Sequence, residues 1–575
     1  MIKTLGKYVK EYKKASILTP IFMFGEVLME MIIPILMSKV IDFGVEKGDL
    51  SYVAKTGSLM FLCALISLSF GSLSGYFGAR ASTGFAKNLR KGMYHNIQNF
   101  SFAEIDKYST AGLITRLTTD VTNVQQSYQM LLRMCIRAPM TFIIAMIMVI
   151  SINAKLGIIF ICAALVLGVA LFFIISNATP IFRSVFKNYD AVNASVQENV
   201  SGIRVVKAYV REDYETQKFT DATQKLKNLF VKAENLIILN APIMQFVMYG
   251  SILLLSWLGA KMIVFGSLTT GELTAMFQYT TNILMSLMMI SMIFVMLTMS
   301  VASGKRIEEI LTQESTLKNP EQPIYDIKDG SVSFHNVSFS YLNNPSKLNL
   351  KNVNIDIKSG ETIGVIGGTG SAKSAFVQLI PRLYDCLDGS VSVGGIDVKN
   401  IDLDTLRNDV SMVLQKNVLF SGTIKDNLKW GNENASDEEI DEALKLACAD
   451  EFVSKMPEKA DTFVERGGTN VSGGQKQRLC IARALIKKPK ILILDDSTSA
   501  VDTATDSKIR KALKDFLPET TKIIIAQRIS SVEEADRIIV LDNGEINGIG
   551  THKQLLENND IYREVYETQM KGSEE

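Results

Sequence analysis

The chain has 575 residues, of which 47% are hydrophobic, and its 61 Lys and Arg residues almost balance its 60 Asp and Glu residues, for a net charge of +1. This hydrophobic content excludes an intrinsically disordered protein, and the balanced charge disfavours a protein that binds nucleic acid through a basic surface. The six cysteines are scattered without a Cys-x-x-Cys pair, so we expect neither a disulfide framework nor a zinc site.

Six apolar runs lie in the first 300 residues, at 17–41, 57–79, 134–152, 156–176, 242–265 and 273–300. Each is long enough to cross a membrane as a helix, since about 20 helical residues span the hydrocarbon core. The first run follows several lysines, but it is too long for a signal peptide and lacks a small-residue cleavage site, so we expect a retained helix. The sequence therefore predicts a membrane α-helical bundle with six transmembrane helices over residues 1–315.

Lys and Arg gather in the N-terminal segment and in the segments 80–133 and 181–235. Because Lys and Arg are enriched on the cytoplasmic side, we expect a multi-pass protein of the plasma membrane with both termini in the cytoplasm. The two long segments are predicted to be cytoplasmic loops in which membrane helices continue and turn back. Short amphipathic pieces at the turns, 101–106 and 201–209, are candidates for docking on a soluble domain.

The composition changes after the sixth run. Pro320 and Pro323 mark a linker over residues 316–329. In residues 330–575, short β-branched runs at 362–366, 491–494, 522–525 and 537–541 alternate with helical stretches. This alternation is typical of an α/β domain built on a parallel sheet.

The run at 362–366 leads into a glycine-rich loop, Gly367-Gly368-Thr369-Gly370-Ser371-Ala372-Lys373-Ser374, which we call the phosphate loop. In such a loop, backbone N–H groups face the phosphates of ATP, the lysine reaches the β and γ groups, and the hydroxyl corresponding to Ser374 binds Mg²⁺. Ala372 stands where a glycine is expected, and Ala375 stands where a second hydroxyl is common. A match of eight residues is weak evidence by itself, and a chance glycine-rich turn is the alternative.

Two further motifs support a nucleotide site. The run at 491–494 ends in Asp495 and Asp496, as a Walker B strand does, and Asp495 is placed to hold Mg²⁺. Between the two motifs lies Val471-Ser472-Gly473-Gly474-Gln475. This segment resembles the Leu-Ser-Gly-Gly-Gln signature of the ATP-binding cassette (ABC) family.

The resemblance to the ABC family assigns further residues and extends over almost the whole chain. It implies that Tyr341 stacks on adenine, that Gln415 is the glutamine that serves catalysis and the Mg²⁺ shell, and that Asp502 belongs to the D-loop. Six membrane helices before one cassette resemble a half-transporter of the ABC exporter class. In that class two cassettes close head to tail, so each ATP lies between the phosphate loop of one chain and the signature of the other.

The resemblance thus implies a translocating ATPase that uses ATP and Mg²⁺ in a lipid bilayer, has no nucleic-acid partner and pairs with a second half-transporter. The turns near 102–106 and 203–209 resemble the coupling helices of the family. The expected activity is export of amphipathic drugs or lipids. The alternatives are a homodimeric lipid or drug flippase and a nucleotide-regulated channel or sensor on the same fold.

The chain departs from the family at one nucleotide site. The hydrolytic base is a glutamate in the family, but here it is Asp496, whose carboxylate reaches one methylene less far. Gln527 replaces the switch histidine, and it can hydrogen-bond a phosphate without carrying the charge or proton of a histidine. Together with Ala372, these changes indicate either tolerated drift, an inactivated mutant, or a degenerate ATP site in a heterodimer. We favour the heterodimer, because the signature is intact apart from Val471 in place of leucine. It would complete the site of a partner that carries the consensus Glu and His.

Polar residues within the apolar runs are candidates for substrate contact. Glu26 and Glu30 share one helix face, and ionisable residues inside a membrane usually face a bundle interior or a cavity. They form a negative patch for cationic amphipathic substrates, or they are neutralised, either by ion pairs with an arginine such as Arg133 or Arg137 or by protonation near the membrane interface. In the sixth run, Gln278 and Asn282 are spaced for a polar stripe toward a cavity.

Overall fold

The computed structural model describes residues 1–574, and it describes their side chains except at positions 183, 186, 187, 190, 291, 294, 295, 298, 299 and 571–574. The chain folds into two compact units. The first, which we call the helical unit, consists of Met1–Gln98 and Thr110–Gln313. The second, the cassette unit, consists of Asn99–Ser109 and Glu314–Glu575.

The helical unit is built from long helices joined by short turns. Its elements are α1 (Ile2–Gly6), η1 (Lys7–Tyr12), α2 (Lys13–Lys39), η2 (Val40–Val45), α3 (Leu50–Gln98), α5 (Thr110–Thr115), η3 (Arg116–Asp120), α6 (Val121–Ile152), α7 (Ala154–Ser201), α8 (Ile203–Ala208), α9 (Glu212–Ile237), α10 (Asn240–Val264) and α11 (Thr270–Thr312).

Five helical stretches among the described residues are long and apolar enough to cross a membrane: Ile2–Val45, Leu50–Gln98, Thr110–Ile152, Ala154–Phe182 and Glu212–Val264. The first five predicted runs fall in these stretches to within one residue. The sixth, at 273–300, falls in α11, where several side chains, including that of Met299, lie outside the described part. The predicted fold class, a membrane helical bundle followed by an α/β cassette, is confirmed.

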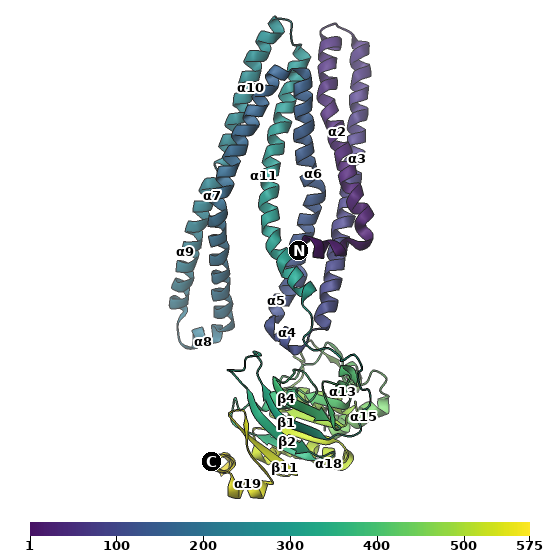
Figure 1. Cartoon of the computed structure of the whole chain (residues 1–575), viewed down its shortest axis with the longest axis vertical. Helices are drawn as coiled ribbons and strands as arrows, with labels where there is room; N and C mark the ends of the chain where they lie inside the picture. Colours follow the sequence, from purple (N-terminus) through teal and green to yellow (C-terminus); the bar gives the residue numbers. More distant parts are fainter. Residues whose placement is uncertain (575) are drawn as a thin grey trace. The chain divides into compact units, whose positions relative to one another are not determined.

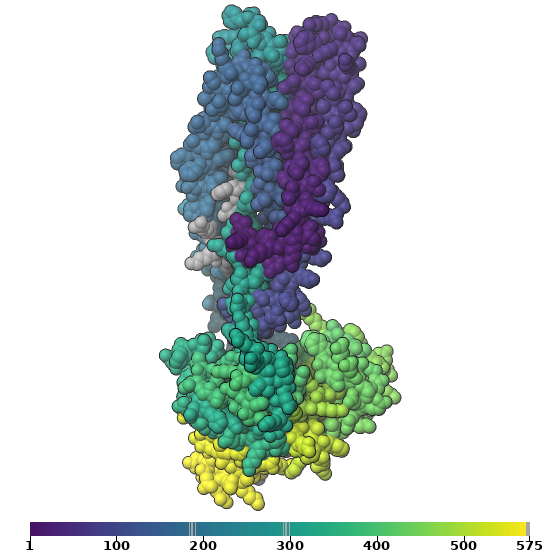
Figure 2. All heavy atoms as spheres, turned by 45° about the vertical axis from the view of Figure 1, so that its right-hand side comes forward, coloured from purple at the N-terminus to yellow at the C-terminus, as the bar shows by residue number. Residues whose placement is uncertain are grey.

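Apolar side chains hold the helices of this unit together. Helix α2 packs along α3, α6 packs along α11, and α7 packs against α9 and α10 (Figure 1). Val27 of α2 and Tyr279 of α11 belong to the central core, and the Tyr279 hydroxyl donates to the backbone oxygen of Met31 at 2.6 Å. Figure 2 shows the N-terminal segment, in purple, lying across the bundle. In this segment, the rings of Tyr8 and Tyr12 pack closely against Gly92 and Gly84 of α3, where a side chain on α3 would clash with them.

The first predicted turn is a short helix, α4 (Phe102–Lys107), and it packs in the cassette unit. Ser101 begins the helix with a capping box, in which Glu104 accepts a hydrogen bond from the Ser101 backbone N–H at 2.9 Å. The ring of Phe102 lies edge-on to Tyr384, and the Tyr384 hydroxyl donates to Asp106 Oδ2 at 2.6 Å. The docking predicted for 101–106 is therefore found. The second predicted turn forms α8 in the helical unit.

The cassette unit contains two main sheets. Its strands are β1 (Val332–Phe339), β2 (Leu350–Ile357), β3 (Thr362–Ile366), β4 (Asp388–Val393), β5 (Ile396–Asp397), β6 (Val410–Val413), β7 (Gly422–Thr423), β8 (Phe463–Val464), β9 (Ile491–Asp495), β10 (Thr521–Ile525), β11 (Arg537–Asp542) and β12 (Glu545–Gly550). The six-stranded sheet has the order β12-β11-β3-β10-β9-β6 and is parallel except for β12. The four runs predicted as strands coincide with β3, β9, β10 and β11. A four-stranded antiparallel sheet, β2-β1-β4-β5, was not predicted.

The remaining elements of the cassette unit are helices. They are α12 (Lys373–Gln378), α13 (Leu403–Asp409), α14 (Ile424–Lys429), α15 (Asp437–Leu446), α16 (Asp450–Val453), η4 (Lys459–Asp461), α17 (Gly473–Leu485), α18 (Thr503–Phe516), η5 (Ile529–Ser531), α19 (His552–Asn558) and α20 (Asp560–Glu574). Because β3, β6, β9 and β10 run in parallel, their carboxyl ends meet at one edge of the sheet. The loops that follow these strands carry most of the predicted nucleotide-binding residues.

The predicted linker, 316–329, belongs to the cassette unit. Ile324 forms an isolated bridge with Ile401, and Asn319 donates to Asp402 Oδ1 at 2.6 Å. Through these contacts the predicted linker packs against the rest of the cassette unit.

Candidate functional site

The phosphate loop joins β3 to α12 in a conformation that needs small residues. A side chain at Gly367 would clash with the backbone oxygen of Leu541 and with Ser371, so only glycine fits there. Gly370 (φ +85°) and Ala372 (φ +71°) both have left-handed backbones. Gly368, Thr369 and Gly370 are exposed, whereas Ser371 is buried. The loop thus presents its exposed backbone at the start of α12, the arrangement that binds phosphate groups.

Lys373 lies over this loop. Its Nζ donates to the backbone oxygens of Gly367 and Gly368, at 2.7 and 2.9 Å. Burial lowers the pKa of Lys373, and the carboxylates of Asp496 and Asp495 oppose that shift. The ammonium is therefore held close to both carboxylates, at the place where phosphate oxygens bind in a loop of this form.

Ser374 and Asp495 lie side by side behind the loop. The Ser374 hydroxyl donates to Asp495 Oδ1 at 3.2 Å, and Asp495, at the end of β9, is only 3% exposed. Burial raises the pKa of Asp495, and the neighbouring Asp496 carboxylate adds to this, while Ser374 and Lys373 lower it. A hydroxyl and a carboxylate are oxygen ligands of the kind Mg²⁺ prefers. The loop, lysine and oxygen ligands therefore fit a nucleotide phosphate chain with Mg²⁺.

Two of the residues that depart from the ABC pattern contact each other. Gln527 Nε2 donates to Asp496 Oδ2 at 2.8 Å, and the Asp496 backbone is left-handed, with φ +49°. The backbone N–H of Asp496 donates to Ile525 at the end of β10, which places both residues at the same edge of the sheet. One carboxylate oxygen of Asp496 is thus held by a neutral amide.

A residue not predicted from the sequence holds Gln527 in turn. Gln569, on α20, donates through Nε2 to the Gln527 backbone oxygen at 2.8 Å and accepts from the Ile529 N–H at 2.9 Å. No sequence motif marks Gln569, because it lies 42 positions away from Gln527 and in a different element.

Tyr341 and Gln415 border the same region. Tyr341 is 41% exposed, and its hydroxyl donates to Gln378 Oε1 of α12 at 2.8 Å. Burial, together with the charges of Asp495 and Asp106, raises the pKa of Tyr341 to about 12, so its phenol stays neutral at physiological pH. Its ring lies edge-on to Tyr384, 5.1 Å between centroids. Gln415 is exposed in the loop after β6, at the carboxyl edge of the parallel sheet.

The signature forms the start of α17 and is joined to the D-loop. Ser472 and Gln475 form a capping box, with the Gln475 N–H donating to Ser472 Oγ at 3.3 Å. A Cβ at Gly474 would lie 2.9 Å from the Ala500 backbone oxygen, so glycine is required at this close approach; Gly473, before it, is exposed. Gln477, also absent from our sequence predictions, accepts from the Ala500 N–H at 3.0 Å.

Asp502 begins α18 by accepting a hydrogen bond from the Thr505 N–H at 2.9 Å, and this bond lowers the pKa of Asp502. The signature, 471–475, and the D-loop, 499–502, therefore lie side by side and form one continuous edge of the cassette unit. In the part of the chain that the structure describes, no hydrogen bond links this edge to the phosphate loop.

In the helical unit, the two glutamates of α2 are paired with an arginine. Arg137 donates to Glu26 Oε1 at 2.5 Å and to both carboxylate oxygens of Glu30 at 2.9 Å. These contacts are the ion pair with an arginine that the sequence offered as an alternative to an unpaired negative patch. On α11, Gln278 is exposed, and Asn282 Nδ2 lies 3.9 Å from Met31 Sδ of α2.

Comparison with known proteins agrees with this architecture. Residues 16–288 match the family model for the ABC transporter transmembrane region, and residues 350–499 match the model for the ABC transporter. The chain is 38% identical over 569 residues to the uncharacterized ABC transporter ATP-binding protein YfiB of Bacillus subtilis, and 34% identical over 581 residues to the uncharacterized ABC transporter ATP-binding protein MT1311 of Mycobacterium tuberculosis. These alignments cover 99% of this chain, 99% of YfiB and 98% of MT1311.

Among solved structures, a bacterial Atm1-family ABC exporter with ATP bound has a similar fold. The TM-score is 0.83 at 23% sequence identity, and the alignment covers 98% of this chain and 99% of that one.

Proposed function

We propose, because this chain belongs to the ABC transporter family, that it is one half of a heterodimeric exporter whose own phosphate-loop site is degenerate. The family membership itself means a multi-pass ABC exporter half-transporter with a transmembrane domain and a nucleotide-binding domain, which drives transport with ATP. The finer proposal places the transmembrane domain at 1–315, the linker at 316–329 and the cassette at 330–575. Its substrates are amphipathic drugs or lipids, exported across the plasma membrane.

One observation carries the proposal of a degenerate site: the contact between Asp496 and Gln527. A general base must come within about 2.6–3.2 Å of the water it activates. The Asp496 carboxylate is one methylene shorter than that of glutamate, and one of its oxygens already accepts the Gln527 amide at 2.8 Å. Weak hydrolysis is the consequence we propose for this site.

The other residues of the site would still bind nucleotide. The backbone of the phosphate loop, with Lys373, would hold the phosphates, and Tyr341 would stack on adenine. Ser374, Asp495 and Gln415 would hold Mg²⁺, which when bound neutralises phosphate charge. The signature of this chain, Ser472 to Gln475 with Asp502, would complete the partner's site, as the head-to-tail pairing of two cassettes in the ABC exporter class implies.

The first prediction concerns where ATP is hydrolysed. We expect the purified chain alone to turn over ATP at least about tenfold more slowly than its complex with a half-transporter that carries the consensus Glu and His. Within the complex, Ser472→Ala should abolish most turnover, because it alters the competent site, whereas Lys373→Ala should reduce it less. Equal turnover by the chain alone would instead support a homodimer. Ion conductance by the complex in a planar bilayer would favour a channel.

The second prediction concerns the base. We expect Asp496→Glu to raise ATP turnover of the complex by less than about threefold, because Gln527 lacks the charge of the switch histidine. The double change Asp496→Glu/Gln527→His should raise it further. A gain of tenfold or more from Asp496→Glu alone would show that the shorter reach of the Asp496 carboxylate was the only defect of the site. The measurement is steady-state phosphate release at saturating ATP.

A further inference from the structure

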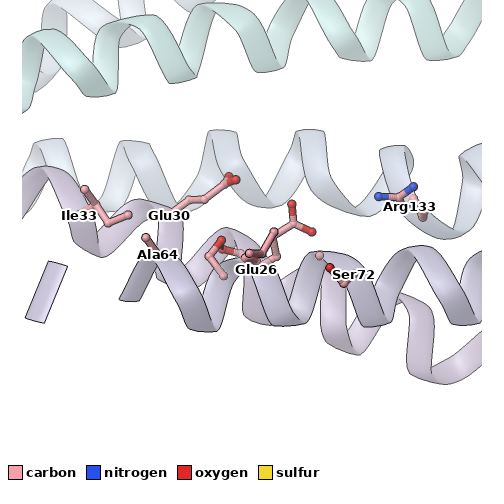
Figure 3. A pocket seen from close by; sticks show the side chains of 9 residues that line it. Glu26, Glu30, Ile33, Ala64, Ser72 and Arg133 are labelled. Carbon is pink, nitrogen blue, oxygen red and sulfur yellow. Dashed lines mark hydrogen bonds between the residues drawn. The ribbon is translucent and has the colours of Figure 1, made fainter. Parts of the chain in front are cut away.

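A pocket of about 550 Å³ lies in the helical unit between α2, α3 and α6. It is a shallow, open groove that leaves much of a bound molecule exposed to its surroundings, and only its volume resembles that of small-molecule sites. Figure 3 shows that Glu26 and Glu30 of α2, Ala64 and Ser72 of α3, and Arg133 of α6 line it. The pocket therefore combines charged groups of both signs within a membrane-spanning bundle.

Two charged groups of this pocket have buried atoms without a partner. Glu26 is 8% exposed, and only its Oε1 is used by Arg137. Glu26 Oε2 and Arg133 Nε are buried, and within the described residues neither has a hydrogen-bond partner. An unpaired buried charged atom is costly, and a ligand that supplies the missing donor and acceptor would remove that cost.

The charge balance selects the kind of ligand. Glu26 and Glu30 supply two negative charges, while Arg133 and Arg137 supply two positive charges, so the ionised cluster is neutral. A ligand with a single charge would leave an uncompensated charge in a medium of low dielectric constant, which is unfavourable. A ligand that carries both charges keeps the cluster neutral and offers a partner of opposite charge to each of the two unpaired atoms.

We propose that this pocket binds the zwitterionic head group of an amphipathic substrate, a protonated amine joined to a phosphate or carboxylate. The amine would lie against Glu26 Oε2 and the anion against Arg133. Leu68, which lines the pocket, is 66% exposed, and Leu65 and Phe61 continue the same apolar side of α3 at 44% and 67% exposure. This stripe offers a place for the apolar tail. The physiological role of this site rests on the proposed export of amphipathic molecules, whereas the binding of the head group does not depend on that proposal.

Two glycines of α3 provide a matched steric test. A Cβ at Gly71 would lie 3.1 Å from Glu26 Oε2, whereas a Cβ at Gly75, one turn further along, would meet no atom within 4 Å. Gly71→Ala therefore crowds the Glu26 carboxyl group, including its unpaired oxygen, without changing any charge. Gly75→Ala makes the same change on the same helix outside the pocket lining.

The test measures equilibrium binding of radiolabelled probes to the full chain in lipid nanodiscs, with empty nanodiscs subtracted. The probes share a dodecyl tail and differ in head group: dodecylphosphoethanolamine, dodecylamine, dodecyl phosphate and dodecyl maltoside, each below its critical micelle concentration. We expect the zwitterionic probe to bind about tenfold tighter than the others, as charge-assisted hydrogen bonds allow. Glu26→Gln should reduce its affinity to that of dodecyl phosphate, and Arg133→Gln to that of dodecylamine.

The controls make the outcome decisive. Gly71→Ala should weaken binding of the zwitterionic probe about tenfold, while Gly75→Ala and the charge-matched Glu212→Gln should not. Equal affinity for all four probes, or equal behaviour of the two glycine variants, would overturn the proposal. Competition by dioleoylphosphatidylethanolamine would identify a membrane lipid as the source of the head group, and lack of competition would identify a single-chain amphiphile; either result supports the zwitterion site.

Measuring ATP turnover of the complex in parallel separates this inference from the proposed function. Selective binding of the zwitterionic probe with no response of turnover would support the site and contradict amphiphile export. Turnover that responds to amphiphiles regardless of head group, and that is unchanged by Glu26→Gln, would support export and overturn the site.

Discussion

Ala372 has φ +71°, in the left-handed region that a residue with a Cβ adopts at a cost of about 1–2 kcal/mol. Gly370, two positions earlier, has φ +85° without such a cost. The alanine therefore stores backbone strain at the start of α12, next to Lys373. This strain comes from a single methyl group in a loop that otherwise uses glycine where it turns.

Replacing this methyl tests the strain directly. We expect Ala372→Gly to stabilise the cassette unit by about 1 kcal/mol, which corresponds to about 2–4 °C in the unfolding midpoint for a domain of this size. Ala375→Gly, the same change inside α12, should destabilise it by about 1 kcal/mol, because glycine is unfavourable in a helix interior. Differential scanning fluorimetry of the purified chain checks both. A lower midpoint for both variants would show that the Ala372 backbone is unstrained.

Helix α4 joins the cassette through side chains that lie far from it in sequence. Glu104 accepts hydrogen bonds from the Ser101 N–H at 2.9 Å and from the Thr316 N–H at 3.2 Å, so one carboxylate holds both α4 and the start of the linker. Burial raises the pKa of Glu104, but these hydrogen bonds and those of the two hydroxyls outweigh it, and the net pKa is lowered. The ionised carboxylate is therefore the form that stabilises this junction.

The hydrogen bond between Tyr384 and Asp106 is the other attachment of α4. We expect Tyr384→Phe to keep ATP turnover of the complex within about twofold while substrate stimulation of turnover falls, because the nucleotide residues are unchanged and a hydrogen bond to a charged group, about 1.5–3 kcal/mol, is lost. Tyr128→Phe, which removes a hydroxyl bonded to Ser16 at 2.8 Å in the helical unit, is the control. Loss of basal turnover in Tyr384→Phe would show that the residue serves nucleotide binding instead.

For the whole molecule, a net charge of +1 is the average of two unlike parts, an apolar helical unit and a charged cassette unit. Lys and Arg are abundant in the long segments 80–133 and 181–235, whereas the short connection at 42–56 has Asp42, Glu46 and Asp49 beside its two lysines. This asymmetry is the basis for placing both termini in the cytoplasm. Because ABC exporters function as dimers, this chain, with its one transmembrane domain and one cassette, needs a second half-transporter.

Chemical labelling tests the proposed orientation. In a chain whose six cysteines are replaced by serine, Lys47→Cys should react with a membrane-impermeant maleimide in intact cells. Lys225→Cys, exposed on α9, should react only after the cells are permeabilised. The reverse pattern would place the termini outside the cytoplasm.

The sequence by itself determined the features that depend on local composition. The apolar runs predicted the long helices because membrane spans need about 20 apolar residues in succession. The β-branched runs predicted β3, β9, β10 and β11 because buried parallel strands are apolar throughout. The loop, strand and signature motifs predicted the nucleotide site because their chemistry lies in contiguous residues. The antiparallel strands were missed, since β1 and β2 mix polar with apolar residues and carry no comparable run.

The tertiary structure alone decided which distant side chains meet. Whether Glu26 pairs with Arg137, 111 positions away, depends on how α2 packs against α6, and both alternatives fitted the sequence equally well. The contacts of Gln569 with Gln527, and of Tyr384 with Asp106, likewise join residues from separate elements. Such pairs are selected by packing geometry and by the cost of leaving buried polar atoms unpaired, and neither is encoded in a local run of residues.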